Sequence, residues 1–257
     1  MLIAVLGICL VLGLCSCFPS SGAEGGGSGW KPPYFETAGF SLENGRAAYE
    51  HDGVFANRAG VDVSENQDWI DWESVAADGI EFAMIRVGYR GTTEGGLFAD
   101  AYYEYNLAGA QEAGVARGVY FFSQAVTVAE AQEEAQFVLS LLDGASLEYP
   151  VAFDYEQNAA GVQSRISDVS SEEATQIARA FCETIEAGGY DAMIYGNSYD
   201  LDLFAMDELG DYSLWYAEYG SAPMCRRPFT IWQYGNSGYV SGIDTAVDMN
   251  LDMSAAL

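Results

Sequence analysis

The sequence predicts an α/β fold, a TIM-like barrel of eight strands with about five β/α units and three terminal strands connected by loops. Three observations predict it. Short, β-rich apolar segments alternate with segments of helical periodicity, which indicates parallel strands joined by right-handed crossovers. After Tyr195 the spacers between the apolar segments shorten and lose the helical period. The 257 residues are 50% hydrophobic, which is enough to bury one sizeable core.

The candidate strands share short length and a high content of β-branched and aromatic residues. They are expected at 59–63, 82–89, 118–123, 151–156, 192–196, 213–217, 230–234 and 246–249. Three longer segments between the early strands show helical spacing of apolar residues, at 98–113, 128–142 and 171–187.

Helix termini are marked by capping residues. Ser170 followed by Glu173 matches a capping box, in which each side chain bonds the other residue's backbone N–H. Glycines at 114, 144 and 188–189 fit the left-handed position that ends many helices, because glycine adopts that conformation at little cost.

The N-terminal residues predict export. Residues 1–17, MLIAVLGICLVLGLCSC, form an uncharged apolar run too short for a comfortable membrane span. The end of this run resembles a bacterial lipobox with Cys17 as the lipidated residue; an ordinary cleaved signal peptide is the alternative. Residues 18–57 follow as a flexible tether and lead-in, and residues 58–257 form the barrel domain. We expect a protein outside a bacterial cell or on its envelope, attached to a membrane only through such a lipid.

Composition restricts the partners and the chemistry. Ten basic against 38 acidic residues give a formal net charge of −28, which repels phosphate backbones, so we expect no nucleic-acid partner. The single histidine, His51, lies in the lead-in, which argues against a histidine-dependent triad or zinc site. We expect no metal, no cofactor and a monomer. Cys182 and Cys225 either form a disulfide or remain as buried thiols.

The stretch VAFDYEQN, at 151–158, places two acids in a strand otherwise suited to burial. Side chains alternate between the two faces of a strand, so Asp154 and Glu156 share one face with the small Ala152, while the bulky residues share the other. In a barrel the bulky face meets the helices. The acids then point inward and reach the C-terminal end of the strand, where the active sites of such barrels lie.

Two acids at this spacing can divide the work of glycosidic cleavage. Their Cα atoms lie about 6.5 Å apart, close enough to shift each other's pKa, so one can stay protonated while the other is ionised. A carboxylic acid protonates the leaving oxygen, and another group stabilises the oxocarbenium-like centre. The alternative is a structural pair whose oxygens accept backbone N–H groups of the following loop.

From Gly60 to Asn250 the chain resembles the glycoside hydrolase family 25 muramidases, the Ch-type lysozymes. The resemblance rests on eight elements in a fixed order. They are GVDVSENQDWIDW (60–72), IRVGYRG (85–91), GVYFFSQA (118–125), PVAFDYE (150–156), IYGNS (194–198), LWYAEYG (214–220), IWQYG (231–235) and VDMN (247–250). It implies a barrel with five β/α units and three terminal strands, and cleavage of the β-1,4 bond after N-acetylmuramic acid in peptidoglycan.

The resemblance also implies roles for the acids. Glu156 matches the general acid, and Asp154 matches the acid that orients the substrate's acetamido group or stabilises the charged intermediate. The family mechanism is either covalent or acetamido-assisted. Asp62 matches an acid at the end of the first strand and Asp248 the acid of the last strand, with Asp244 a weaker candidate. Without the resemblance, Asp62 is a turn or cap residue before Ser64, which is the commoner role of Asp at the end of a strand.

Aromatic residues near the predicted strand ends fit the lining of a saccharide cleft, because sugar rings present apolar C–H faces that pack on aromatic planes. Tyr89, Tyr120, Tyr195 and Trp215 are the preferred candidates. The expected function is a muramidase acting on peptidoglycan glycan strands. The rival is a glycan-binding protein on the same barrel that performs no chemistry. So acidic a domain also suits an enzyme that remodels its own host's wall, or digests fragments, at least as well as a secreted bacteriolytic agent.

Overall fold

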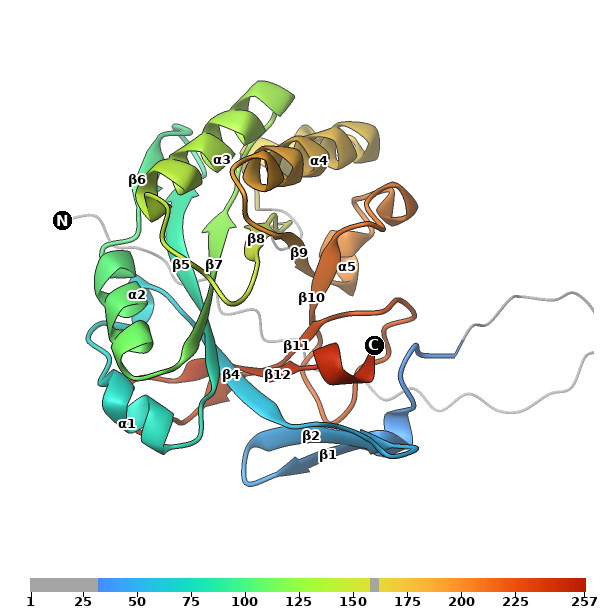
Figure 1. The fold of residues 1–257 in the computed structure, drawn as a ribbon. Coiled ribbons are helices and arrows are strands. Elements are labelled where there is room, and N and C mark those ends of the chain that lie inside the picture. The colour runs from blue at the N-terminus through green and yellow to red at the C-terminus, as the bar shows by residue number, and fades with distance from the viewer. Residues whose placement is uncertain (1–31, 158–161) are drawn as a thin grey trace, which may run out of the picture.

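The computed structural model describes residues 32–157 and 162–257, and in these residues eight strands close into a barrel (Figure 1). The strands are β4 (Arg58–Val63), β5 (Phe82–Arg90), β7 (Ala116–Phe122), β8 (Val151–Asp154), β9 (Ala192–Asn197), β10 (Ser213–Ala217), β11 (Ile231–Gly238) and β12 (Val247–Asp252). Neighbours from β4 through β11 pair in parallel, and β12 pairs antiparallel with both β11 and β4 to close the ring.

Helices follow the first five barrel strands, as predicted. They are α1 (Trp72–Ala77), α2 (Tyr103–Glu112), α3 (Val128–Leu142), α4 (Ser171–Ala187) and α5 (Ser198–Leu201). The connections from β10 to β11 and from β11 to β12 are loops. The described residues also contain short 3-10 helices: η1 (Thr37–Gly39), η2 (Glu65–Gln67), η3 (Arg165–Asp168), η4 (Met206–Glu208) and η5 (Ser254–Ala256).

One expected helix boundary is wrong. The helix predicted from residue 98 begins at Tyr103, and Leu97–Ala99 is instead strand β6, paired antiparallel with the end of β5. The Phe98 ring stacks on Tyr89 with ring centroids 5.4 Å apart but stays 49% exposed, so pairing with β5, and not burial in the core, makes this segment a strand. The capping box of α4 is confirmed, since Ser170 Oγ accepts the Glu173 N–H and the Glu173 carboxylate accepts the Ser170 N–H.

The predicted lead-in contains a three-stranded antiparallel sheet of β1 (Phe40–Glu43), β2 (Arg46–His51) and β3 (Val54–Ala56). It lies against the helix-free side of the barrel, beside β4 and β12 (Figure 1). The Phe35 ring packs 4.7 Å from Phe229, the Phe40 ring packs 5.0 Å from Trp232, and both contacts are edge to face. The sheet therefore covers apolar outer side chains that no helix covers.

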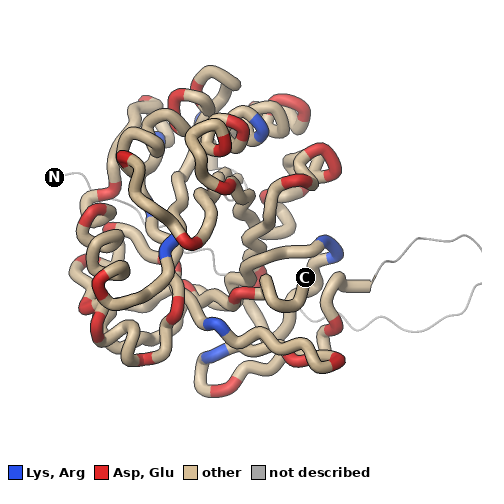
Figure 2. The backbone as a smooth tube through the Cα atoms, in the orientation of Figure 1, with Lys and Arg blue, Asp and Glu red and all other residues tan. Residues whose placement is uncertain are grey.

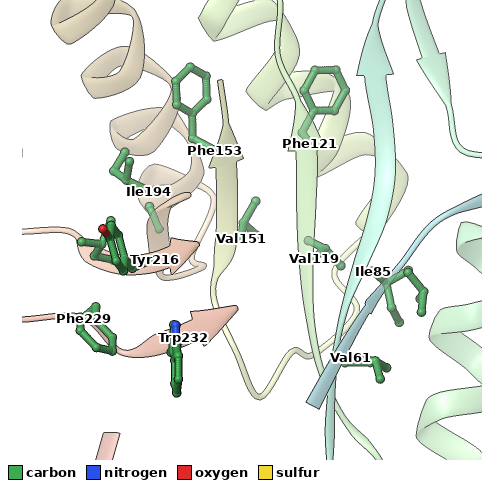
Figure 3. Packing of buried hydrophobic residues seen from close by; sticks show 14 of the residues in the cluster. Val61, Ile85, Val119, Phe121, Val151, Phe153, Ile194, Tyr216, Phe229 and Trp232 are labelled. Carbon is green, nitrogen blue, oxygen red and sulfur yellow. The ribbon is translucent and has the colours of Figure 1, made fainter. Parts of the chain in front are cut away.

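The core has two layers separated by the barrel wall. Outward-facing residues such as Val61, Ile85, Val119 and Phe153 pack between the strands and the surrounding helices (Figure 3). A second, inner cluster fills the barrel below its mouth and contains Phe82, Met84, Ala152, Met193, Tyr195, Trp215 and Ile231. Side chains of β8 thus alternate between the layers as the sequence predicts.

Several predictions concern residues 1–31, which lie outside the described residues, including the export signal and lipidation of Cys17. Cys182 and Cys225 are both buried free thiols. Within residues 32–157 and 162–257, no helix has both the length and the apolar character needed to span a membrane.

Candidate active site

Strand register brings the predicted acids to one end of the barrel. Asp62 on β4 lies directly opposite Asp248 on β12, and Asp154 at the end of β8 lies opposite Tyr195 on β9. Because the strands between β4 and β8 pair in parallel, the ends that carry Asp62 and Asp154 lie at the same edge of the barrel. Burial raises the pKa of Asp154 most, and the charges of Glu156, Asp200 and Asp62 add to the rise. The four acids Asp62, Asp154, Glu156 and Asp248, hereafter the acid cluster, therefore face one mouth.

Asp62 is a buried acceptor of two amide hydrogen bonds. Its Oδ2 accepts Gln233 Nε2 at 2.9 Å and Asn250 Nδ2 at 2.8 Å. Burial raises the pKa of Asp62 to about 6, while the two amide donors and Asp248 oppose the rise because they stabilise the carboxylate. Asp62 is consequently the acid of the cluster best equipped to carry a negative charge.

Buried donors fix the orientation of those two amides. The Trp215 indole N–H donates to Asn250 Oδ1 at 2.8 Å, and the Tyr195 hydroxyl donates to Gln233 Oε1 at 3.0 Å. An indole nitrogen only donates, so Asn250 must turn its oxygen toward Trp215 and its NH₂ toward Asp62. Trp215 thereby selects the Asn250 rotamer that supplies Asp62 with an N–H group, while the Tyr195 hydroxyl occupies the oxygen of Gln233.

Asp154 is 4% exposed, and its Oδ1 has no hydrogen-bond partner among the described residues. Burial is the largest cause that raises the pKa of Asp154 well above its usual range, followed by the charges of Glu156 and Asp200. A buried carboxyl oxygen without a partner is costly in a folded protein. Among the described residues, this oxygen is therefore a buried, unsatisfied acceptor within the acid cluster.

Glu156 lies two residues beyond the end of β8 and is half-buried. Burial raises the pKa of Glu156 to about 7, and the nearby Asp200 charge adds to the rise. Asp200, at the start of α5, is itself fixed because its Oδ1 accepts the Gln157 N–H at 2.8 Å. A carboxylic acid that still holds its proton near neutral pH can act as a general acid.

Asp248 completes the acid cluster. It is half-buried, and burial raises the pKa of Asp248 to about 8, with the Asp62 charge as the next cause. The weaker candidate Asp244 is exposed in the loop before β12. The order of the pKa values keeps a proton on Asp248 under conditions where Asp62 has lost its own.

The predicted aromatic residues occupy different depths. The Trp215 ring lies 4.5 Å from Tyr195 and 5.8 Å from the half-buried Tyr120, in the interior just below the acids. Trp215 is 1% exposed and thus lies beneath the mouth. Tyr89 stands apart at the end of β5, between Phe98 and the Arg86 guanidinium, whose Cζ is 5.1 Å from the Tyr89 ring centroid.

Sequence reasoning missed Gln233, Asn250, Asp200 and Tyr219. Asn250 is two residues after Asp248, so strand alternation could have placed both on the inner face. Gln233 is a polar residue between Trp232 and Tyr234 in an apolar strand, which is also a usable signal. Tyr219 lies in the loop after β10, is exposed, and donates to Gln233 Oε1 at 3.3 Å. A loop has no regular alternation of side chains, so the sequence does not predict which way Tyr219 points.

Comparisons with known proteins agree with this geometry. The family model described as Glycosyl hydrolases family 25 matches residues 61–243. The autolytic lysozyme of Clostridium acetobutylicum is 29% identical over 194 residues, which are 74% of this chain and 54% of the relative. Lysozyme M1 of Streptomyces globisporus is 28% identical over 74% of this chain and 66% of its own length. The chain thus spans about half of the clostridial relative and two thirds of the other.

Solved structures show the same fold. The lysozyme of Streptomyces coelicolor superposes with a TM-score of 0.64 at 26% identity, covering 75% of this chain and 90% of that one. A family 25 glycosyl hydrolase of Bacillus anthracis gives a TM-score of 0.66 at 22% identity, covering 82% and 94%.

Proposed function

Because the chain belongs to glycosyl hydrolase family 25, we propose that it is a muramidase, which hydrolyses the β-1,4 bond between N-acetylmuramic acid and N-acetylglucosamine in peptidoglycan. The observation that carries the proposal is Glu156, a half-buried acid with its pKa raised to about 7 beside the other acids of the cluster. Relatives named as lysozymes support the same substrate. The bacterial cell wall is the proposed place of action.

Glu156 is the proposed general acid, which gives its proton to the glycosidic oxygen as the bond to the leaving sugar breaks. The positive charge that develops on the remaining sugar ring needs an anion nearby. Asp62 fits this need, because its two amide donors favour the ionised form.

Asp154 is proposed to act on the substrate's 2-acetamido group. Its unpartnered Oδ1 would accept the acetamido N–H, and that contact would itself favour the ionised form of Asp154. Proton donation by Glu156 and departure of the leaving sugar are common to two routes. Either the acetamido oxygen, oriented by Asp154, bonds to the anomeric carbon as the glycosidic bond breaks, or Asp154 stabilises the charged centre directly. In both routes water then adds to the anomeric carbon and its proton returns to Glu156.

Of the aromatic residues, the half-buried Tyr120 and the exposed Tyr219 are proposed to contact sugar from the wall of the mouth, with the buried Tyr195 beneath them. Their support is proximity, since the charges of the acid cluster raise the pKa of each of these phenols after burial does. We place Trp215 under this wall as the support of Asn250, and Tyr89 farther along the cleft.

Product analysis tests the proposal. The purified protein is incubated with peptidoglycan and the new reducing ends are identified by mass spectrometry; N-acetylmuramic acid ends are expected. N-acetylglucosamine ends, or no release, would refute the muramidase. Saturable binding of muropeptides without turnover would instead favour the non-catalytic glycan-binding rival.

The general acid is tested separately by Glu156→Gln, which keeps the size of the side chain and removes the proton. Turnover is expected to fall by roughly 10²- to 10⁴-fold, the usual contribution of general acid catalysis. Glu112→Gln on the exposed face of α2 is the matched control and should retain full activity. Full activity in Glu156→Gln would remove the assignment.

A further inference from the structure

Three aromatic side chains form a cluster at the rim of the barrel, outside the acid cluster. Trp69 comes from the loop between η2 and α1, and Tyr102 and Tyr105 come from the start of α2. The Trp69 ring centroid lies 4.4 Å from that of Tyr105 and 5.5 Å from that of Tyr102, both nearly perpendicular. Trp69 nevertheless remains 64% exposed. We call these three residues the rim platform.

The rim platform lies at the same end of the barrel as the acid cluster. The loop that carries Trp69 follows the C-terminal end of β4, which holds Asp62. Tyr102 follows β6, which pairs with the C-terminal end of β5. Strand ends of this polarity form the mouth, so Trp69 and the acid cluster share one face of the molecule.

Buried ionic contacts hold the two segments of the rim platform together. Asp100, just before Tyr102, accepts Arg86 Nε at 2.8 Å and the Glu65 N–H at 2.9 Å on the same oxygen. The Glu65 carboxylate in turn accepts Arg86 Nη2 at 3.0 Å. Arg86 points from β5 into this junction, so the loop after β4 and the start of α2 are tied to the barrel wall.

The polar ends of the tyrosines are already occupied. The Tyr105 hydroxyl donates to the Ile70 carbonyl at 2.7 Å, and the Tyr102 hydroxyl donates to Asp68. What the rim platform offers to a ligand is therefore the apolar plane of the Trp69 indole, held in a fixed orientation. A rigid aromatic surface loses little conformational entropy when it binds.

The negative charges around the rim platform favour an uncharged ligand. Asp68 and Glu104 flank the platform in a chain of net charge −28, which disfavours an anionic ligand group at this place. The C–H face of a pyranose ring is uncharged and packs well on an indole plane. We propose that the rim platform is an auxiliary glycan-binding site, which stacks an N-acetylhexosamine ring on Trp69 beyond the sugars held at the acid cluster. The inference rests on the proposed function for the identity of the glycan.

The test compares ligands of two lengths on full-chain protein carrying Glu156→Gln, so that binding is measured without turnover. The probes are peptide-free peptidoglycan glycan strands of at least ten sugars and a tetrasaccharide of the same repeat, both with their lactyl carboxylates amidated so that they differ in length and not in charge. Trp69→Ala should weaken binding of the long strands by roughly two- to tenfold, the range of an aromatic stacking contact, and leave the tetrasaccharide unaffected. Trp69→Phe should restore part of the loss. Phe55→Ala, which removes an exposed aromatic ring from β3, is the matched control and should change neither.

Unchanged affinity of Trp69→Ala for the long strands would overturn the inference. An equal loss for both ligands would overturn it as well, because the effect would then originate at the acid cluster. If the wild-type protein releases no reducing ends, the proposed function fails, while the length comparison still decides whether Trp69 binds glycan.

Discussion

The protonation states of Glu156 and Asp62 determine the pH range in which the proposed reaction can proceed. The pKa of Glu156 is about 7 and that of Asp62 about 6, in both cases raised by burial. Proton donation requires protonated Glu156, so activity should fall as pH rises through 7. Stabilisation of positive charge requires ionised Asp62, so activity should also fall below pH 6. We expect a bell-shaped dependence of kcat/KM on soluble glycan strands with its maximum between pH 6 and 7. A rate that stays constant to pH 9 would contradict this.

The same raised pKa lowers the stability of the native state at alkaline pH. An unfolded glutamic acid has a pKa of about 4.3, so the native protein keeps a proton on Glu156 that the unfolded chain releases. The contribution of Glu156 to the free energy of unfolding therefore decreases from about pH 4 to pH 7, by up to about 1.4 kcal/mol for each pH unit.

Glu156→Gln removes this titration. We expect the variant to be more stable than the wild type at pH 8, by more than about 1 kcal/mol, and the difference to shrink at pH 4. Urea denaturation at both pH values measures it, with Glu112→Gln as the control that should behave as wild type. A variant less stable than the wild type at pH 8 would show that the carboxylate stabilises the fold.

Trp215 gives a second residue-scale prediction. Trp215→Phe keeps an aromatic ring but deletes the N–H that holds Asn250, so the amide can turn its oxygen toward Asp62. The pKa of Asp62 should then rise, because it loses a donor to its charged form.

The expected result is a lower kcat, with little change in KM, and an acidic limb of the pH profile moved to higher pH. Trp232→Phe is the matched control, since the Trp232 N–H donates outward to the Glu218 carbonyl. An acidic limb that moves equally in both variants would assign the effect to general loosening of the barrel.

The sequence predicts the role of a residue well when that role depends on one strand, and poorly when it depends on how several strands pair. Alternation along 151–156 is a property of one strand, and it placed Asp154 and the bulky residues on the correct faces. The partners of Asp62 come from β11 and β12, so only the register of three strands identifies them. The sequence could suggest that Trp215 lies near the mouth, but its depth depends on packing against Tyr195 and Tyr120.

At the scale of elements, the sheet of β1, β2 and β3 covers the outer side chains of the barrel that no helix covers. Phe35 is 5% exposed and packs against Phe229, so Phe35→Ala should leave a cavity and lower the free energy of unfolding by about 3 kcal/mol. Phe55→Ala in the same sheet removes a ring that is 52% exposed and should cost little. Chemical denaturation of the two variants compares them. Equal stability would mean that the sheet contributes nothing to the barrel.

Elements with a strong period were predicted closely, and short or composite ones were not. The bounds of α3 and α4 agree with the predicted 128–142 and 171–187, because each helix spans enough turns to repeat its apolar face. Leu97–Ala99 has three residues and takes its structure from the neighbouring β5. Two-residue turns at Asn44-Gly45 and Asp52-Gly53 join β1 to β2 and β2 to β3. The apolar residues of these short strands pack on the barrel, so the local spacing of apolar residues does not identify them as strands.

At the scale of the whole molecule, charge is the dominant property. Acidic residues are spread over all parts of the fold and basic residues are few (Figure 2), and the formal net charge of the chain is −28. Several of the few basic residues also pair with acids; Arg86, Arg90 and Arg117, for example, each pair with acids close to the barrel wall. The outer surface therefore repels anionic polymers at distances set by the ionic strength.

This repulsion predicts how salt affects the proposed reaction. Screening lengths fall from about 30 Å at 0.01 M salt to about 8 Å at 0.15 M, so salt removes most of the long-range repulsion between this protein and an anionic cell wall. The rate of release of reducing ends from intact walls should therefore rise several-fold over this range. A soluble fragment with its acidic groups amidated is the control, and its cleavage should change little because only short-range contacts at the mouth act on it. A rate on intact walls that falls as salt is added would mean that the protein approaches its substrate through an attractive surface, which its charge distribution does not provide.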